Sequence, residues 1–200
     1  MSAVIQTAED VVNLGLRRIG FVGRVGSLYD GSAAAKIALD TYGQTRDALL
    51  SDGNWEFAER NVLGAIYKAA PVGGYVPPNT WTSAYPALPW RYSYVYPDDC
   101  LKVRAVKTAP AFIQNADPKT QRYSVDNDGG IRVILSNVQN AVIVYTGQVT
   151  NPSTFDVEFI EALAAAIGRR LAPALVGVEG AKLAMNDEMY EKQQADRTQE

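Results

Sequence analysis

The part of this chain that comes nearest to a chemical motif is an acidic, glycine-rich segment, Asp126-Asn127-Asp128-Gly129-Gly130. Alternating Asp and Asn oxygens followed by a glycine are typical of a calcium-binding loop. Here the glycine comes one position too early, and Asn137 occupies the position where a bidentate glutamate is required. Asn, Asp and Gly also favour tight turns, and we therefore interpret the segment as a hairpin turn.

Two carboxylate pairs are the next candidates. Asp98-Asp99 could help to hold magnesium, but its position between Pro97 and an expected strand favours a turn or a strand-entry cap. Glu56 and Glu59 are three residues apart, and nothing near them in the sequence predicts the raised pKa that a general acid needs. We expect neither pair to carry chemistry.

Phosphate recognition has two weak signals. Gly20, Gly23 and Gly26 are evenly spaced, but they follow an expected helix and lack the Gly-Lys-Ser/Thr sequence of a phosphate-binding loop. The arginine pairs Arg17-Arg18 and Arg169-Arg170 are isolated from other basic residues. Such pairs more often lie on solvated or intersubunit faces.

The absence of histidine excludes most of the remaining chemistry. The chain has no histidine and one cysteine, Cys100. It therefore lacks Ser-His-Asp and Cys-His catalysis, imidazole zinc sites and the ordinary proton shuttle near neutral pH. We expect Cys100 to be a buried small apolar side chain. The sequence predicts no catalytic, cofactor-binding or metal-binding residues, and we expect a protein that is not an enzyme.

Charge and hydropathy indicate a globular, water-soluble chain. The net charge of −3 argues against a reader of nucleic-acid sequence, which usually needs a basic face. No apolar run approaches the ~20 residues of a membrane span, so we expect no membrane partner. Residues 1–176 carry 16 basic and 16 acidic side chains, whereas residues 177–200 carry three basic and six acidic ones. The whole net charge therefore lies in the C-terminal segment.

Hydrophobic periodicity predicts two helices at each end of the chain. The first runs from about Thr7 to Ile19 and begins with a capping-box pair of Thr7 and Asp10. The second runs from about Ala33 to Leu50, after a cap at Ser32.

The C-terminal pair of helices follows the same logic. The apolar face of Phe155 to Leu171 predicts a third helix, with Ser153 and Asp156 as a capping pair. Pro173 should break or kink it. A final polar helix is expected over about Glu179 to Gln194.

In the middle of the chain, apolar and polar residues alternate as they do in β-strands. The expected strands are Tyr92–Tyr96, Leu101–Lys107, Gln121–Val125, Ile131–Leu135 and Ala141–Thr146. Residues 126–130 and 136–140 both have the composition of hairpin turns. We therefore expect an α+β fold, a bundle of about four helices with an inserted antiparallel β-sheet or sandwich. In one composite domain, residues 1–60 and 151–200 would form the helical core, 61–91 a loop rich in aromatic residues and proline, and 92–150 the β insertion.

Large aromatic residues mark the ends of the helical core and the loop. Trp55 and Phe57, just past the second expected helix, should anchor the chain on the core. The loop combines five of the ten prolines with four large aromatic side chains, Tyr75, Trp81, Tyr85 and Trp90. It could fold back on its own core, but interfaces are enriched in Tyr and Trp, and we favour contact with another subunit.

The order of these motifs resembles the tail tubular protein A family, the head-to-tail adaptors of short-tailed phages. The matching pieces are the helix from Ala8 to Gly20, Ser27-Leu28, Tyr42 to Leu50, Trp55-Glu56-Phe57-Ala58, Tyr96-Pro97-Asp98-Asp99-Cys100-Leu101-Lys102-Val103, Tyr145, and Phe155 to Leu171. The resemblance covers most of the chain and is weakest between Gly73 and Trp90 and in the final helix.

The resemblance implies a structural role in the virion. It implies a ring, by family likeness of twelve subunits, that assembles in the host bacterial cytoplasm and sits at the neck between the portal protein and the tail nozzle. Phage DNA would pass through its lumen without sequence-specific contacts, and no cofactor is implied. We expect the aromatic loop and the acidic C-terminal helix to carry the interfaces. The residues expected there are Tyr75, Trp81, Tyr85, Trp90, Glu179, Lys182, Met185, Glu188, Met189 and Lys192.

Two other readings of the sequence stay open. A head-completion or connector protein of a long-tailed phage would have a similar helical core and the same task. A nucleic-acid-binding helical module belongs to a different class, and it predicts DNA affinity that falls steeply with salt.

Overall fold

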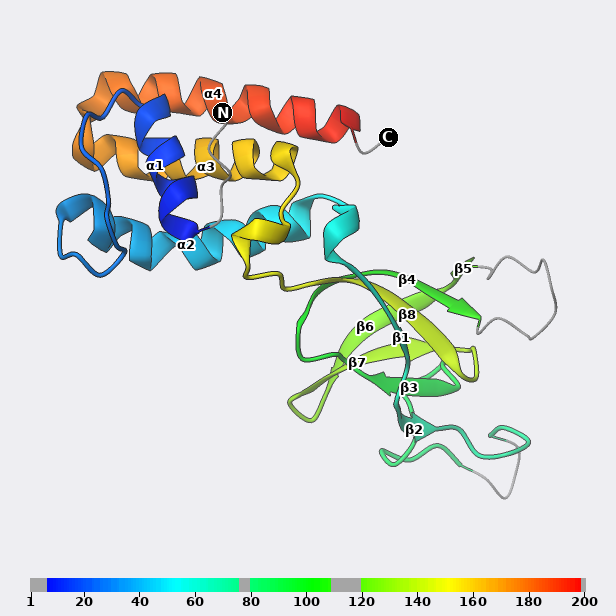
Figure 1. Cartoon of the computed structure of the whole chain (residues 1–200). Coiled ribbons are helices and arrows are strands. Elements are labelled where there is room, and N and C mark those ends of the chain that lie inside the picture. Colours follow the sequence, from blue (N-terminus) through cyan, green and yellow to red (C-terminus); the bar gives the residue numbers. More distant parts are fainter. Residues whose placement is uncertain (1–6, 76–79, 109–119, 199–200) are drawn as a thin grey trace. The chain divides into compact units, whose positions relative to one another are not determined.

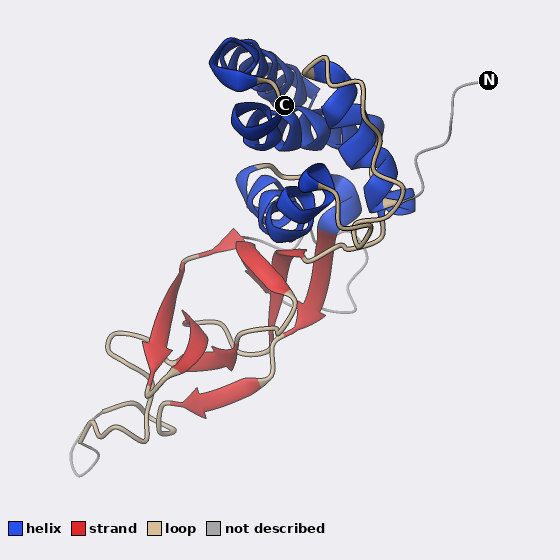
Figure 2. Ribbon diagram, turned by 90° about the vertical axis from the view of Figure 1, so that its left-hand side faces the viewer, coloured by secondary structure: helices blue, strands red, loops and turns tan. Residues whose placement is uncertain are grey.

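The computed structural model describes residues 7–75, 80–108 and 120–198. Within these residues the chain forms four α-helices and two four-stranded antiparallel sheets, the α+β architecture expected from the sequence (Figures 1 and 2). It divides into two compact units: a helical unit of residues 1–58 and 148–200, and a β unit of residues 59–147. The strands are therefore inserted in the sequence between the helices, and they form a compact unit of their own.

The helical unit is built around its third helix. The helices are α1 (Ala8–Arg18), α2 (Ala33–Asp52), α3 (Val157–Leu175) and α4 (Gly177–Thr198), and α3 contacts each of the other three (Figure 1). Phe159, Leu163 and Ile167 of α3 are fully buried, which confirms the predicted apolar face. The caps expected at Thr7 and Ser32 are also present.

Helices α1 and α3 touch through their backbones. A Cβ added at Gly15 of α1 would lie 2.6 Å from the carbonyl oxygen of Ala164 of α3. A Cβ added at Gly168 of α3 would lie 2.9 Å from the carbonyl oxygen of Gly15. Only residues without a side chain allow two helices to approach this closely, so these two glycines set the distance between α1 and α3.

An aromatic cluster closes the helical unit where the chain leaves α2. The Phe159 ring lies 5.0 Å from Trp55, 5.2 Å from Phe57 and 4.8 Å from Phe155, measured between centroids. The indole Nε1 of Trp55 donates to the carbonyl of Leu49 at 3.0 Å. Trp55 and Phe57 therefore anchor the chain on the core, as expected.

The ends of α3 differ from the prediction. Ser153 lies in a 3₁₀ turn, η2 (Pro152–Thr154), and Asp156 is the N-cap without a side-chain hydrogen bond. Pro173 lies inside α3, which continues to Leu175. A proline near the end of a helix removes only one late hydrogen bond. The chain instead turns into α4 at Gly177, whose φ of +76° suits glycine.

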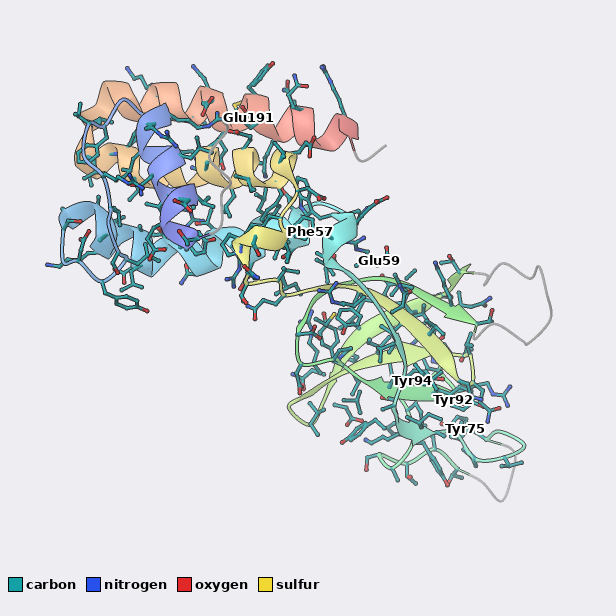
Figure 3. All side chains as sticks on the ribbon, in the orientation of Figure 1. Phe57, Glu59, Tyr75, Tyr92, Tyr94 and Glu191 are labelled. Carbon is teal, nitrogen blue, oxygen red and sulfur yellow. The ribbon has the colours of Figure 1, made fainter. Side chains whose placement is uncertain are left out.

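The β unit is a sandwich of two sheets. One sheet has the order β1 (Glu59–Leu63), β8 (Ala141–Gly147), β4 (Cys100–Thr108) and β5 (Thr120–Gln121). The other has the order β2 (Ile66–Ala69), β3 (Tyr92–Val95), β7 (Ile131–Ser136) and β6 (Tyr123–Asp128). Tyr94 and Ile134 of the second sheet are buried together with Val106 and Ile143 of the first (Figure 3 labels Tyr94).

Two predictions about the β unit are wrong. Residues 61–69 were expected in a loop, but they lie mostly in the edge strands β1 and β2. Nearly every residue of these strands is exposed, so no alternation marks them in the sequence. Residues 136–140 were expected to close a hairpin, but β7 and β8 lie in different sheets and the chain crosses between them. Turn-forming residues such as those at 136–140 are therefore compatible both with a hairpin and with a connection between two sheets.

The acidic glycine-rich segment is the hairpin turn that the sequence predicts. β6 and β7 pair up to Asp128 opposite Ile131, and Gly129 and Gly130 have positive φ. The side-chain oxygen of Asn127 accepts from the backbone N–H of Gly130 at 2.7 Å. The amide oxygen of Asn127 is therefore used in the turn itself.

Candidate assembly surfaces

Three acidic residues of α4 whose side chains the structure describes, Asp187, Glu188 and Glu191, pair with cations of the helical unit. The guanidinium of Arg18, on α1, donates to the two carboxylate oxygens of Asp187 at 2.8 and 2.9 Å and to Glu191 at 3.0 Å (Figure 3 labels Glu191). It also donates to Glu161 of α3 at 2.5 Å. The Arg18 side chain is only 20% exposed, so one cation joins three helices at a largely buried place.

The carboxylates around Arg18 stabilise its charged form. Burial lowers the pKa of Arg18, but the hydrogen bonds that it donates to Glu161, Asp187 and Glu191 outweigh that effect and hold the pKa above its ordinary value. Arg18 was expected on a solvated or intersubunit face, and this expectation is wrong. Its partners lie far away in the sequence, which is why spacing alone did not reveal them.

Two more ion pairs tie α4 to its own unit. Arg169 of α3 pairs with Glu188, and Lys192 pairs with Asp52 of α2. Glu188 and Lys192 were expected at an interface with a partner, and the structure gives both an internal role. Asp187, Glu188 and Glu191 of α4 therefore all pair with cations of the same unit.

The outer face of α4 exposes large apolar side chains among polar ones such as Lys182 and Asn186. Met185 and Met189, one turn apart, are 55% and 54% exposed, and Tyr190 is 58% exposed. Lys182 is exposed near the start of this face, whereas Ala184 is buried on the opposite side. The structure thus brings three of the predicted residues, Lys182, Met185 and Met189, to one surface. The side chain of Glu179 lies outside the described residues.

Tyr190 is a surface residue that the sequence did not single out. It lies about 140° around the helix from Met185, so a strict apolar stripe does not include it. Its exposure accompanies the inward position of Asp187 and Glu191, which both bind Arg18 of α1. In the sequence, only the positions of Asp187 and Glu191 could have indicated which side of α4 faces solvent.

The aromatic loop folds back on its own sheet. Trp90 is only 8% exposed and lies against Val133 and Leu135 of β7, with the guanidinium of Arg122 5.5 Å from its ring centroid. This is the alternative that the sequence left open. Trp90 is therefore part of the β unit's own packing and not a free interface residue.

The other three aromatic residues of the loop divide between packing and exposure. Tyr75 and Tyr85 meet edge to face with centroids 5.7 Å apart, and both are partly buried (Figure 3 labels Tyr75). Trp81 remains 47% exposed. Of the four predicted interface aromatics, Trp81 is the one that presents a large surface to solvent.

The edge strands carry an apolar surface that the sequence analysis missed. Val62 and Leu63 of β1 are 40% and 61% exposed, and Ile66 and Tyr67 of β2 are 46% and 37% exposed. β1 and β2 are each the first strand of their sheet. The sequence signal for this surface was two apolar pairs, Val62-Leu63 and Ile66-Tyr67, on either side of Gly64-Ala65. Exposed apolar edge strands are sites where another chain can add.

The segment from Tyr96 to Val103 has a structural role. The phenol of Tyr145 donates to Asp99 at 2.9 Å, which gives Asp99 a partner inside the β unit. Cys100 is buried, as expected, and burial raises the pKa of its thiol. Burial also raises the pKa of Tyr96, whose ring lies 4.1 Å from the guanidinium of Arg132. A protonated thiol in such surroundings is not an activated nucleophile.

Among the described residues, no group of three or more His, Cys, Asp or Glu side chains is placed to hold a metal ion. No helix in the described ranges combines the length and apolar character that crossing a bilayer requires. Comparison with known proteins gave no match, either to a protein-family model or to a curated protein.

Proposed function

We propose that this protein is a phage head-to-tail adaptor that assembles as a ring, of twelve subunits by family likeness, between the portal protein and the tail nozzle. The proposal rests on the resemblance of the sequence to the tail tubular protein A family. DNA would pass through the ring without sequence-specific contacts, and the protein would reside in the neck of the virion.

The observation that carries the proposal is the outer face of α4. Met185, Met189 and Tyr190 expose apolar surface, interspersed with the exposed Lys182 and Asn186, on a helix whose inner side makes three partly buried ion pairs. Methionine and tyrosine are enriched at protein interfaces, and methionine adapts to irregular partner surfaces. A rigid helix with such a face suits docking, and we assign this face to the portal protein.

The test uses the portal protein of the same phage and negative-stain images of the mixture. The wild-type chain should add a second ring to the portal. The double variant Met185→Asp, Met189→Asp should bind the portal at least about tenfold more weakly, because two charges would be buried at the contact. Val22→Asp is the matched control, since Val22 is fully exposed outside α4.

The outcomes separate the function from the surface. A wild-type chain that adds no ring to the portal would refute the adaptor function. A stacked ring that the α4 double variant forms as well as the wild type would refute the assignment of the α4 face alone. Circular dichroism of both variants checks that they are folded.

A further inference from the structure

The outer face of the second sheet holds a hollow that the adaptor function does not use. Its volume is about 160 Å³. Ala87, Val133 and Leu135 form apolar wall and floor, and Trp81 and Tyr85 add aromatic surface. The remaining lining residues are polar: Lys68, Ser83, Asp126, Asn127 and Asp128.

The walls of this hollow are fixed by hydrogen bonds. The indole Nε1 of Trp81 donates to the carbonyl of Pro86 at 2.8 Å, so the orientation of the half-exposed ring is set from within the loop. The ammonium of Lys68 donates to the carbonyl of Ser83 at 2.8 Å and pairs with Asp128. These bonds hold the loop on one side and the β6–β7 turn on the other.

The polar groups in the wall include both donors and acceptors. The amide oxygen of Asn127 accepts from the backbone N–H of Gly130, and its Nδ2 makes no hydrogen bond among the described residues and is open as a donor. One carboxylate oxygen of Asp126 accepts from the backbone of Asn127 at 2.8 Å, which leaves the other open as an acceptor. Lys68 already neutralises Asp128.

We propose that this hollow binds a neutral pyranose sugar. The exposed face of Trp81 takes the apolar C–H face of the ring, while the hydroxyl groups bond to Asp126 and Asn127. Pockets that combine an apolar, aromatic wall with a few fixed polar groups are typical of small-molecule sites. A guanidinium or ammonium ligand fits less well, because it requires acceptors alone and would meet the ammonium of Lys68.

The experiment is a titration of the full-length protein with methyl β-D-glucopyranoside and methyl β-D-galactopyranoside, followed by saturation-transfer NMR and tryptophan fluorescence. A ligand of this size should bind with a Kd of about 1 mM. Trp81→Ala should weaken binding at least about tenfold, and Trp81→Phe should retain part of it. Val72→Ala, at a fully exposed position in the same loop, is the matched control.

The outcomes are decisive in both directions. Saturable binding of either sugar that is lost in Trp81→Ala and kept in the control supports the site. Absence of saturation with both sugars, or equal binding by Trp81→Ala, overturns it. Binding of N-acetyl-arginine amide without binding of either sugar also overturns it, in favour of a cation pocket. Since the Trp81 side chain is half exposed, its variants should fold, and circular dichroism checks this.

Discussion

The contact between α1 and α3 predicts that one substitution has opposite effects at two glycines. Gly15→Ala places a methyl group 2.6 Å from the carbonyl oxygen of Ala164, whereas the space around Gly43 in α2 is open within 4 Å. Both glycines lie inside helices, where alanine is intrinsically more favourable than glycine. The two variants therefore share the gain in helix propensity and differ only in packing.

The magnitudes follow from these distances. Ordinary contact begins near 3.4 Å, so α1 and α3 must move apart by about 0.8 Å at Gly15, the difference between the two distances. The obstacle is backbone and cannot rotate away, so the packing cost should be near the upper end for overpacked cores, about 3 kcal/mol. The propensity gain of about 1 kcal/mol offsets part of it. We expect Gly15→Ala to lower the free energy of unfolding by about 2 kcal/mol and Gly43→Ala to raise it by up to about 1 kcal/mol.

The assay is urea and thermal unfolding followed by far-UV circular dichroism, because the described helices all lie in the helical unit. The Gly15 variant should lose roughly 10 °C in Tm, and the Gly43 variant should gain a few degrees. Equal shifts of the same sign in both variants would refute the reasoning, because they would show that backbone proximity at Gly15 has no energetic consequence.

Two further predictions concern ionisable groups. Arg18→Met leaves the carboxylates of Glu161, Asp187 and Glu191 without their cation, and since these groups are partly exposed we expect a loss of about 2 kcal/mol and faster hydrogen exchange in α4. Arg17→Met is its control, and unchanged exchange in α4 would contradict the prediction. Burial and the bond to Asp99 raise the pKa of Tyr145 to about 12, above the ordinary value of about 10. The folded β unit therefore holds this proton more tightly, so the stabilisation is complete below about pH 10 and is lost as the pH rises toward 12. Tyr145→Phe should flatten the fall of the urea midpoint between those pH values, and an unchanged slope would count against it.

Local signals in the sequence were sufficient for the helices. The capping box at Thr7 and the apolar face of Phe159, Leu163 and Ile167 depend only on residues within a few turns of one another, and the structure confirms both. The hairpin turn at 126–130 is local in the same sense. Each of these features is encoded by the residues that form it.

Features that depend on distant partners were not predictable in this way. β1 is exposed along its whole length, so its sequence shows no alternation of buried and exposed residues that would mark it as a strand. It becomes a strand because β8 offers hydrogen bonds from residues 142–146, some 80 positions away. Trp90 is similar, since the composition of its loop suits an interface and a folded-back segment equally, and only Val133 and Leu135 decide between them.

The acidic C-terminal helix shows how this difference bears on function. Its composition suggested a polar helix whose residues, Glu188 and Lys192 among them, lie at an interface with a partner. Arg18 lies 169 positions before Asp187, and together with Arg169 it turns the described acids inward and leaves Met185 and Met189 outside. The stabilising ion pairs and the face that we propose for docking thereby lie on opposite sides of one helix. For this reason Met185→Asp, Met189→Asp should leave the free energy of unfolding nearly unchanged while it weakens assembly. Arg18→Met should lower the free energy of unfolding and leave the residues of the outer face in place.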